Sequence, residues 1–306
     1  MENQQPLISV LLIAMNHEKF IEQACKSILN QSYNEIEVIF LDNNSSDQTF
    51  EIADRFFKNT KIKYIGIKNK ENKGVSENLN ILVANANGKY ISILSGDDWY
   101  EDKNIESRFY FLIKNDLDVV LADGYKFIED KQERKDVYSN KRKQKVIQTI
   151  HDYYNVNLVN NITCNFGFFT KREILTKHKF DEQVHAEDWD INLRLSKEGY
   201  KFGFLDRKTF NYRILNTSLS HNVDLMRKSF LKVTEKYQTE IDSNSNHRDA
   251  YIMRLIEFDI IDLKQNPNKT KFEKEKLRNL QFQLHSLKYK GLKRIYKNIL
   301  LYFKNQ

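Results

Sequence analysis

The chain has 306 residues, 40% hydrophobic and 30% charged, and this composition argues against a disordered protein and predicts a globular one. Its two cysteines, Cys25 and Cys164, form no CxxC pair, which argues against a disulfide framework or a cysteine-based zinc site. The net charge of +7 belongs to the tail, because residues 271–306 carry ten Lys or Arg against two Glu and the rest of the chain sums to −1.

Apolar runs are too short to span a bilayer. The longest of them, such as residues 10–14, fall far below the roughly 18–20 residues that a membrane helix needs. We therefore do not expect a polymerase with its own membrane channel. The polar start, residues 1–6, does not resemble a signal peptide, and a cytoplasmic location is expected.

The first hundred residues alternate between buried strands and amphipathic helices. Strands are predicted at residues 8–13, 38–41, 62–67 and 90–94, with helical apolar spacing between them. The third strand alternates apolar residues with Lys or Gly, as expected near a sheet edge. This order predicts an α/β fold with a parallel sheet, right-handed crossovers and helices on both faces.

The pattern is less regular after residue 100. A helix is predicted around residues 105–113, a strand at 119–122, a helix at 185–196 and a strand at 201–205. Residues 129–145 are highly charged and without periodicity, so we expect a mobile loop there. From about residue 222 the pattern is helical to the end.

Acidic residues follow two of the predicted strands, and parallel sheets bind ligands beyond the carboxyl ends of their strands. Asp97 and Asp98 can hold a hard divalent cation that neutralises a diphosphate, and Gly96 before them permits a close backbone approach. Asp42 can accept the ring N–H of a uracil-type base. A solvated turn with a helix cap is the structural alternative at both places.

Glu187 and Asp188 open the predicted helix at residues 185–196. A carboxylate here could act as a general base that takes the proton of an attacking hydroxyl. Acidic residues in a first helical turn also complement the helix dipole, so this alternative stays open.

Fragments between Ile8 and Ser220, about two-thirds of the chain, together resemble glycosyltransferase family 2. They are, in order, Ile8-Ser9-Val10 with Asn16, residues 27–32, 41–49, 72–76 and 88–91, Gly96-Asp97-Asp98, Glu187-Asp188-Trp189 and Tyr212-Arg213. The resemblance implies a GT-A fold, a Rossmann-like, mixed but mainly parallel sheet flanked by helices. It places a catalytic domain at residues 1–221, with the nucleotide-sugar half at about 1–100 and the acceptor half at about 101–221. A helical C-terminal extension follows at residues 222–306.

The resemblance also implies a role for each carboxylate. Asp42 would contact the base, Asp97 would lie near the ribose or sugar, and Asp98 would bind Mn²⁺ or Mg²⁺. Asp188 would be the catalytic base of an inverting single displacement, and Arg213 would stabilise the departing diphosphate. The residues expected to bind the nucleotide sugar are Ile13, Ala14, Met15, Asn16, Glu18, Asp42, Asn44, Gly74, Ser76, Asn80, Asp97, Asp98 and Arg213.

The implied reaction moves a sugar from a nucleotide diphosphate, with UDP as the expected nucleotide, to a hydroxyl of a glycan or lipid-linked glycan. Surface polysaccharide, lipopolysaccharide or glycoprotein glycan assembly would use it. The chain departs from the family in three places. Residues 13–16 read Ile-Ala-Met-Asn instead of Pro-x-Tyr-Asn, Leu79 precedes Asn80 where Arg is frequent, and Leu215 stands where a His often follows. His221 is a displaced candidate for a second metal ligand.

Residues 288–304 form a predicted basic amphipathic helix, with six Lys or Arg and no acid. Such a helix can lie on an anionic membrane surface, here the inner face of the cytoplasmic membrane, or pack its apolar stripe on the catalytic domain. Rival functions are a nucleotidyltransferase, whose usual glycine- and lysine-rich phosphate loop the chain lacks, and a non-catalytic nucleotide- or glycan-binding relic of the fold. A nucleic-acid partner is not expected, because the basic character is confined to the tail.

Overall fold

The structure is a computed structural model that describes residues 5–163, 168–215 and 222–289. The described residues form two compact units. The first comprises residues 5–157, 161–163 and 168–215, and the second comprises residues 158–160 and 222–289. The catalytic domain expected at residues 1–221 and the extension expected at 222–306 remain predictions.

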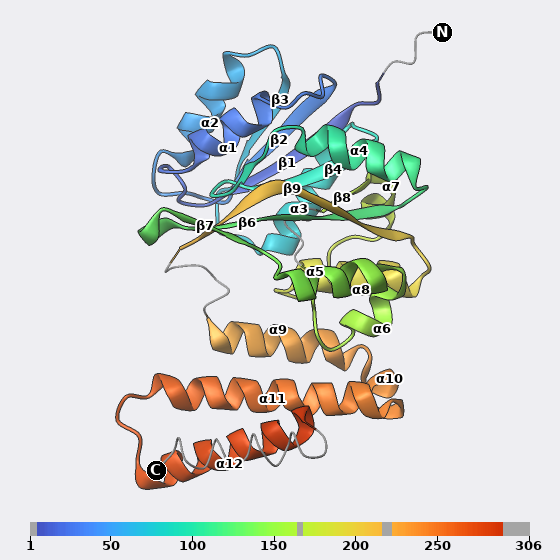
Figure 1. Cartoon of the computed structure of the whole chain (residues 1–306). Helices are drawn as coiled ribbons and strands as arrows, with labels where there is room; N and C mark the ends of the chain where they lie inside the picture. The colour runs from blue at the N-terminus through green and yellow to red at the C-terminus, as the bar shows by residue number, and fades with distance from the viewer. Residues whose placement is uncertain (1–4, 164–167, 216–221, 290–306) are drawn as a thin grey trace. The chain divides into compact units, whose positions relative to one another are not determined.

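The first unit is built on one nine-stranded sheet, whose strands run in the order β3-β2-β1-β4-β8-β6-β9-β5 with β7 paired to β6 (Figure 1). Strands β1 to β4 are parallel to one another, as are β6 and β9, whereas β5, β7 and β8 pair antiparallel. This mixed α/β architecture confirms the predicted fold class. The strands are β1 Ile8–Ala14, β2 Ile36–Asp42, β3 Lys63–Lys68, β4 Tyr90–Ser95, β5 Trp99–Tyr100, β6 Val119–Ile128, β7 Glu133–Asp136, β8 Phe169–Lys171 and β9 Phe202–Ile214.

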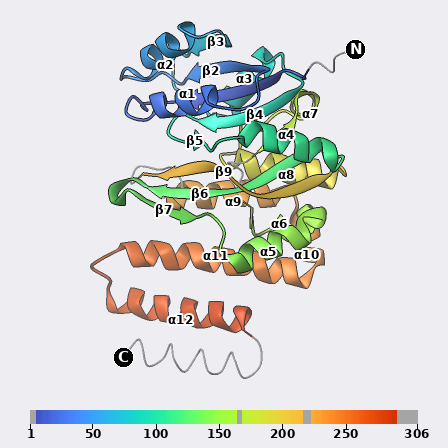
Figure 2. The same ribbon diagram turned by 45° about the horizontal axis from the view of Figure 1, so that its top comes forward.

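Helices cover both faces of this sheet. Helices α1 and α2 lie on one face, and α3 lies on the other (Figures 1 and 2), as right-handed crossovers require when the strand order reverses between β3 and β4. The helices of the first unit are α1 Ile21–Leu29, α2 Thr49–Lys58, α3 Val75–Asn85, α4 Asn104–Lys114, α5 Asn140–Thr149, α6 Tyr153–Asn157, α7 Arg172–Lys177 and α8 Glu187–Lys197, with 3₁₀ turns at Glu129–Lys131 and Ile150–Asp152.

The core lies around the central strands. Every residue of β2 is buried, and β1 is buried at six of its seven positions, which explains their nearly continuous apolar sequence. Burial of a large aliphatic side chain such as Leu11 or Leu12 contributes about 1.5–3 kcal/mol before entropy is counted. Strand β3 lies at the edge of the sheet, and four of its six residues are exposed, which confirms its expected place.

The expectation of a mobile loop at residues 129–145 was wrong. Strand β7 pairs with β6 in this segment, and α5 begins where the Ser139 side chain accepts a hydrogen bond from the Arg142 backbone N–H. All four residues of β7 are exposed, so this hairpin is held by backbone hydrogen bonds and needs no apolar periodicity. Val146, which is 1% exposed, anchors α5. A search for apolar periodicity cannot find such an element.

The second unit is helical, with α9 Val223–Glu235, α10 Gln238–Ser243, α11 Ser245–Gln265 and α12 Lys271–Lys288. Arg227 of α9 pairs with both Asp259 and Asp262 of α11, and Thr270 and Glu273 form a capping box at the start of α12. Residues 290–304 of the predicted basic helix lie outside the described residues.

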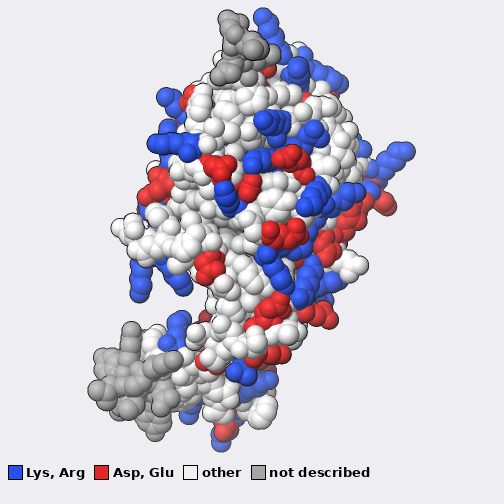
Figure 3. Space-filling model, turned by 90° about the vertical axis from the view of Figure 1, so that its right-hand side faces the viewer, with Lys and Arg blue, Asp and Glu red and all other residues white. Residues whose placement is uncertain are grey.

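Charges of both signs are interspersed over the face of the molecule seen in Figure 3, without a large area of a single sign. None of the helices in the described ranges combines the length and the apolar character needed to cross a membrane.

Candidate active site

Three loops predicted to bind the nucleotide sugar meet at the carboxyl edge of the parallel strands. Ala14 at the end of β1 is in register with Asp42 of β2, and Ile13 with Ser95 of β4. The Gly96 backbone N–H donates to the Ile13 carbonyl at 2.7 Å, which continues the ladder into the loop that carries the acidic pair. Segment 13–16, the Asp42 turn and the Asp97-Asp98 loop are therefore adjacent.

Asp42 is fully buried at the end of β2. One carboxylate oxygen, Oδ1, accepts a hydrogen bond from the Ser45 backbone N–H at 2.9 Å, which shapes the turn. The other, Oδ2, is also buried but has no hydrogen-bond partner among the described residues. A buried acceptor left without a donor costs about 1–3 kcal/mol, so this oxygen is suited to receive a donor from a ligand.

Asn16 and Glu18 join the loop after β1 to the loop after β2. The Asn16 side chain Oδ1 accepts from the Ser46 N–H at 2.9 Å, and the Glu18 carboxylate accepts from the Gln48 N–H at 3.2 Å. Asn16 and Asn44 have φ angles of 55° and 62°, a left-handed conformation that asparagine tolerates. Met15 is 38% exposed between these residues and the strand end. These contacts hold the loops after β1 and β2 together. The contact of Asn16 and Glu18 with the nucleotide sugar stays a prediction.

Asn43 was not singled out by sequence, yet its side chain organises the neighbouring loop. Its amide N–H₂ donates to Asn72 Oδ1 and to the Lys73 carbonyl, both at 2.9 Å, and its Oδ1 accepts from the Lys73 N–H at 2.8 Å. Gly74 follows directly as the N-cap of α3. The only available signal was its place beside Asp42 in a polar turn.

Ser76 and Asn80, both on α3, connect this helix to the segment before α8. The Ser76 hydroxyl donates to the Val184 carbonyl at 3.1 Å, while the Asn80 side chain exchanges hydrogen bonds with the Phe180 backbone at 2.9 and 3.0 Å. Their polar groups are thus used to position residues 180–184. Their expected contact with the nucleotide sugar stays a prediction.

Asp188 lies in the first turn of α8, so the sequence located this helix start correctly within two residues. Its Oδ1 accepts from the Trp189 backbone N–H at 2.6 Å, and the Trp189 indole donates to the Asn157 carbonyl at 2.7 Å, which holds the turn in place. Burial, and next the charge of Asp188, raise the pKa of the Glu187 carboxyl above its ordinary value. The Glu187 carboxyl therefore holds its proton more tightly than an ordinary glutamate does.

A series of hydrogen bonds connects the Asp42 turn with α8. Asn43 holds residues 72–73, the chain passes into α3, and Ser76 holds Val184 three residues before Glu187. Segments far apart in sequence, around residues 42, 75 and 184, are therefore positioned together within the first unit.

Asp97 and Asp98 differ in environment although they are neighbours. The Asp97 side chain is 15% exposed, and its Oδ1 accepts from the Ser95 hydroxyl at 2.5 Å. Asp98 is 4% exposed, and its Oδ1 accepts from the Arg213 backbone N–H at 2.8 Å. Burial, and next the Asp97 charge, raise the pKa of the Asp98 carboxyl well above its usual range. Of the pair, Asp97 is the more accessible to a ligand.

The Arg213 side chain is 4% exposed and is surrounded by protein groups. Its guanidinium donates to the Asp97 carbonyl at 2.7 Å and to Gln23 Oε1 at 2.6 Å, and it pairs with Glu129. The expected contact with the diphosphate stays a prediction, and a diphosphate would have to displace some of these partners. What Arg213 does here is clamp the loop of the acidic pair.

His17, which sequence reasoning missed, lies over this loop. Its Nδ1 is 4.0 Å from Asp97 Oδ1 and is buried without a hydrogen-bond partner among the described residues. The only sequence signal was its position next to Asn16. His221, the second metal candidate, lies outside the described residues.

A divalent cation fits this loop only if a bound substrate supplies some of the metal ligands. The described residues contain no cluster of three His, Cys, Asp or Glu side chains that could hold a metal alone. Mg²⁺ and similar cations are commonly bound by one or two carboxylates together with substrate phosphates. The accessible Asp97 carboxylate fits that type of site, and beside it lies the His17 Nδ1, which has no hydrogen-bond partner in the part of the chain that the structure describes.

The sequence matches the family model described as glycosyl transferase family 2 over residues 9–179, more than half of the chain. An uncharacterized glycosyltransferase of Methanocaldococcus jannaschii is 31% identical over 219 residues, which cover 70% of this chain and 73% of that protein. Chondroitin synthase of Escherichia coli is 28% identical over 83% of this chain, which spans only 37% of the synthase.

Two solved structures share the fold. S. aureus TarS residues 1–349 in complex with UDP has a TM-score of 0.57 at 17% identity, covering 98% of this chain and 92% of that one. The mannosyltransferase PcManGT of Pyrobaculum calidifontis in complex with GDP-Man and Mn²⁺ has a TM-score of 0.56 at 14% identity, covering 98% of this chain and 74% of that one. At these identities the likeness concerns the fold alone.

Proposed function

Since the chain belongs to glycosyl transferase family 2 and is therefore a glycosyltransferase, we propose that it moves a sugar from UDP to an acceptor hydroxyl with inversion at the anomeric carbon. The observation that carries this proposal is the buried Oδ2 of Asp42 at the carboxyl edge of the sheet, to which none of the described residues donates a hydrogen bond. The other residues of the site are assigned around it.

Asp42 recognises the base. No described residue donates to Oδ2, so this oxygen can take an N–H from the ligand, and uracil offers one at N3 and guanine one at N1. The ring nitrogens at the corresponding places of cytosine and adenine are acceptors and would meet the carboxylate with repulsion. Because each unmade buried hydrogen bond costs about 1–3 kcal/mol, Asp42 should select UDP or GDP sugars over CDP or ADP sugars by about tenfold or more.

The acidic loop receives the diphosphate. The resemblance gave the metal to Asp98, but burial of Asp98 and its hydrogen bond to the Arg213 N–H favour Asp97 as the carboxylate that faces the cation. Asp97 would hold a Mn²⁺ or Mg²⁺ ion, which would supply positive charge that stabilises the departing diphosphate. Asp98 and Arg213 hold the loop in position for this contact.

Asp188 acts as the catalytic base. In a single displacement it takes the proton from the acceptor hydroxyl as the oxygen bonds to the anomeric carbon, while the bond to the diphosphate breaks on the opposite face. General base catalysis of this kind contributes typically about 10²–10⁴-fold. Burial and the neighbouring Asp188 charge raise the pKa of the Glu187 carboxyl, so Asp188 rather than Glu187 is assigned the role of base.

The acceptor is a glycan or lipid-linked glycan of surface polysaccharide, lipopolysaccharide or glycoprotein assembly. The similarity to chondroitin synthase over 83% of this chain supports a polysaccharide among these. The enzyme would work in the cytoplasm, with residues 288–304 able to bring it to the inner face of the cytoplasmic membrane. Co-sedimentation with anionic vesicles before and after removal of residues 288–306 tests that location.

A panel of UDP-, GDP-, CDP- and ADP-sugars tests the proposed donor. Nucleotide release is measured with Mn²⁺ or Mg²⁺ present and again with EDTA. We expect nucleotide release to be fastest with a UDP-sugar as donor, and we expect EDTA to suppress it. Equal release from all four nucleotides, or release that ignores EDTA, would contradict the roles given to Asp42 and Asp97.

A further inference from the structure

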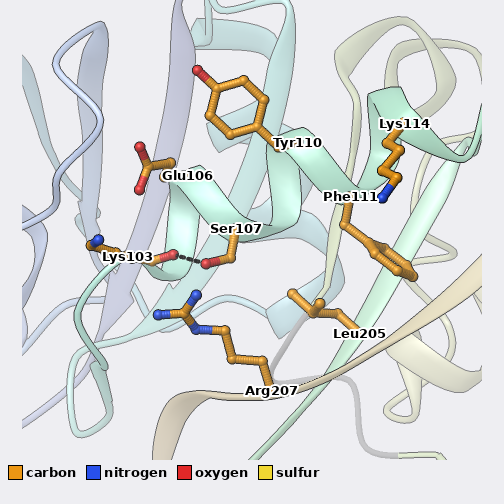
Figure 4. A pocket seen from close by; sticks show the side chains of 8 residues that line it. All are labelled: Lys103, Glu106, Ser107, Tyr110, Phe111, Lys114, Leu205 and Arg207. Carbon is orange, nitrogen blue, oxygen red and sulfur yellow. Dashed lines mark hydrogen bonds between the residues drawn. The ribbon is translucent and has the colours of Figure 1, made fainter.

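A concave surface lies on the first unit between α4 and β9, apart from the residues of the proposed active site (Figure 4). It is a pocket of about 380 Å³, open to solvent, and none of the residues assigned to the active site lines it. In Figure 4, Phe111 points from α4 toward Leu205 of β9, and Arg207 extends from β9 toward the first turn of the helix. The proposed function leaves this pocket without a role.

Three cations surround the pocket, and none of their charged groups is neutralised by a described residue. Lys103, Lys114 and Arg207 make no ion pair or side-chain hydrogen bond within the described part of the chain. The one acid of the lining, Glu106, already accepts a hydrogen bond from the Ser32 hydroxyl at 2.9 Å. The pocket therefore has an excess of positive charge that an anionic ligand would complement.

Some other lysines on the same unit are neutralised by carboxylates. Lys143 and Lys208 both pair with the buried Asp123, and Lys201 pairs with Asp116. Other exposed cations of the unit, such as Lys61 and Lys63, also make no ion pair within the described residues, so what distinguishes the pocket is that three such cations border one concavity.

The interior of the pocket is apolar. Phe111 and Leu205 contribute its apolar surface. Tyr110, which is 50% exposed, adds an aromatic ring to the lining. Aromatic rings combine apolar contact area with little loss of conformational freedom, and the C–H faces of sugar rings pack against them. An anion with an apolar face, such as a sugar acid, matches both properties, whereas a small inorganic anion would use only the charges.

The pocket extends away from the proposed active site. Helix α4 begins six residues after Asp98, and its start is fixed to β9 because the Asn104 side chain and the Glu101 backbone N–H both donate to the Thr209 carbonyl. From there its 11 residues run for about 16 Å. Lys103 thus marks the end nearer the acidic loop, and Lys114 the distant end. A linear polymer could follow such a track while one terminus reacts.

We propose that the pocket between α4 and β9 binds a carboxylate-bearing segment of the acceptor glycan, several sugars away from the reacting terminus. The inference rests on the proposed function, because it takes the bound glycan to be the acceptor of the transferase. Binding of the glycan itself needs no catalysis. Lys103, Lys114 and Arg207 pair with uronic acid carboxylates, with the Arg207 guanidinium able to bind one of them bidentately. Tyr110 and Phe111 pack against sugar faces.

Binding is tested on the full chain with an oligogalacturonate of about ten sugars, compared with a maltooligosaccharide of equal length that carries no charge. The pocket variant is Lys103→Gln/Lys114→Gln/Arg207→Gln. The matched control is Arg55→Gln/Lys61→Gln/Lys63→Gln, which removes the same charges from exposed positions around α2 and β3. We expect the wild type to bind the anionic oligomer, the pocket variant to lose at least about tenfold in affinity, and the control to change less than about twofold.

Equal losses in the pocket variant and the control would overturn the proposal, as would absence of binding by the wild type or equal binding of the neutral oligomer. Tyr110→Leu separates sugar packing from charge attraction and should weaken binding about threefold or more. If anionic lipid vesicles bind, and the pocket variant alone loses that binding, the pocket serves a membrane and the proposal fails. UDP titration of the same samples distinguishes a failure of the proposed function, because UDP binding does not involve this pocket.

Discussion

The carboxylate of Asp98 accepts a hydrogen bond from the backbone N–H of Arg213 at 2.8 Å, which joins the loop after β4 to the end of β9 across 115 residues of sequence. The Arg213 guanidinium returns to the same loop by donating to the Asp97 carbonyl at 2.7 Å. The two residues therefore determine the shape of the loop together. In this arrangement Asp97 remains the accessible carboxylate.

Asp98→Ala and Asp97→Ala should have different effects. Loss of the Asp98 carboxylate leaves the buried Arg213 N–H without an acceptor, so the free energy of unfolding should fall by about 1–3 kcal/mol. Asp97→Ala should change stability little and weaken Mn²⁺ binding in the presence of UDP by about tenfold or more. Thermal unfolding and Mn²⁺ titration by electron paramagnetic resonance measure the two effects. If Asp98→Ala alone abolishes Mn²⁺ binding in a protein that stays folded, the metal belongs to Asp98.

Gly96→Ala should disturb both stability and donor binding. An added Cβ would lie 2.6 Å from the Ala14 Cβ and 3.0 Å from Ile21 Cδ1, so the loop and the end of β1 must separate. Overpacking of this kind costs about 1–3 kcal/mol. Gly74→Ala is the matched control for stability, because its added Cβ meets no atom within 4 Å and its φ of −64° suits alanine. Thermal unfolding compares the two variants, and UDP titration checks Gly96→Ala against the wild type. Equal melting temperatures of the two variants would contradict the close approach.

Asp42→Asn should weaken UDP binding by about tenfold to a hundredfold, because an amide can present N–H₂ where the base needs an acceptor. Asp54→Asn makes the same substitution on α2, where the carboxylate pairs with Lys58, and should leave affinity unchanged. Isothermal titration calorimetry with UDP measures both. Unaltered UDP affinity in Asp42→Asn would contradict the proposed contact between Asp42 and the base.

Glu187 should make stability depend on pH. Its folded-state pKa lies above the ordinary glutamate value, so the folded protein holds this proton more tightly than the unfolded chain does. Its contribution to stability is therefore present in acid and declines as pH rises from the ordinary value through the raised one. Glu187→Gln stays neutral, so its melting temperature relative to the wild type should rise between about pH 5 and pH 9. A constant difference across this range would show that the carboxyl is not perturbed.

Sequence reasoning found what local pattern encodes. The continuous apolar runs of β1 and β2 predicted strands buried on both faces, and the acidic residues at strand ends predicted which edge carries the site. The order of short motifs predicted the family, which the comparisons confirm. Each of these features lies within a few residues of sequence.

Contacts between distant segments could not be predicted in the same way. Nothing in the sequence around Arg213 indicates that its side chain pairs with Glu129 and Gln23, or that its backbone holds Asp98. The hairpin of β6 and β7 is exposed and charged, so it carries no apolar signal, and its stability comes from backbone pairing. The sequence also does not indicate that Asp97 is more exposed than Asp98, because the burial of each side chain depends on its neighbours in the fold.

The most direct test of the central claim measures UDP affinity and nucleotide release together in Asp188→Asn, with Asp190→Asn as the control on the same helix. Asp190 forms an ion pair with Arg194 and has no assigned part in turnover. With a UDP-sugar, Mn²⁺ and acceptor, we predict that Asp188→Asn releases nucleotide at least about 100-fold more slowly while binding UDP as the wild type does. Wild-type release by Asp188→Asn, or a wild-type protein that does not bind UDP, would contradict the account.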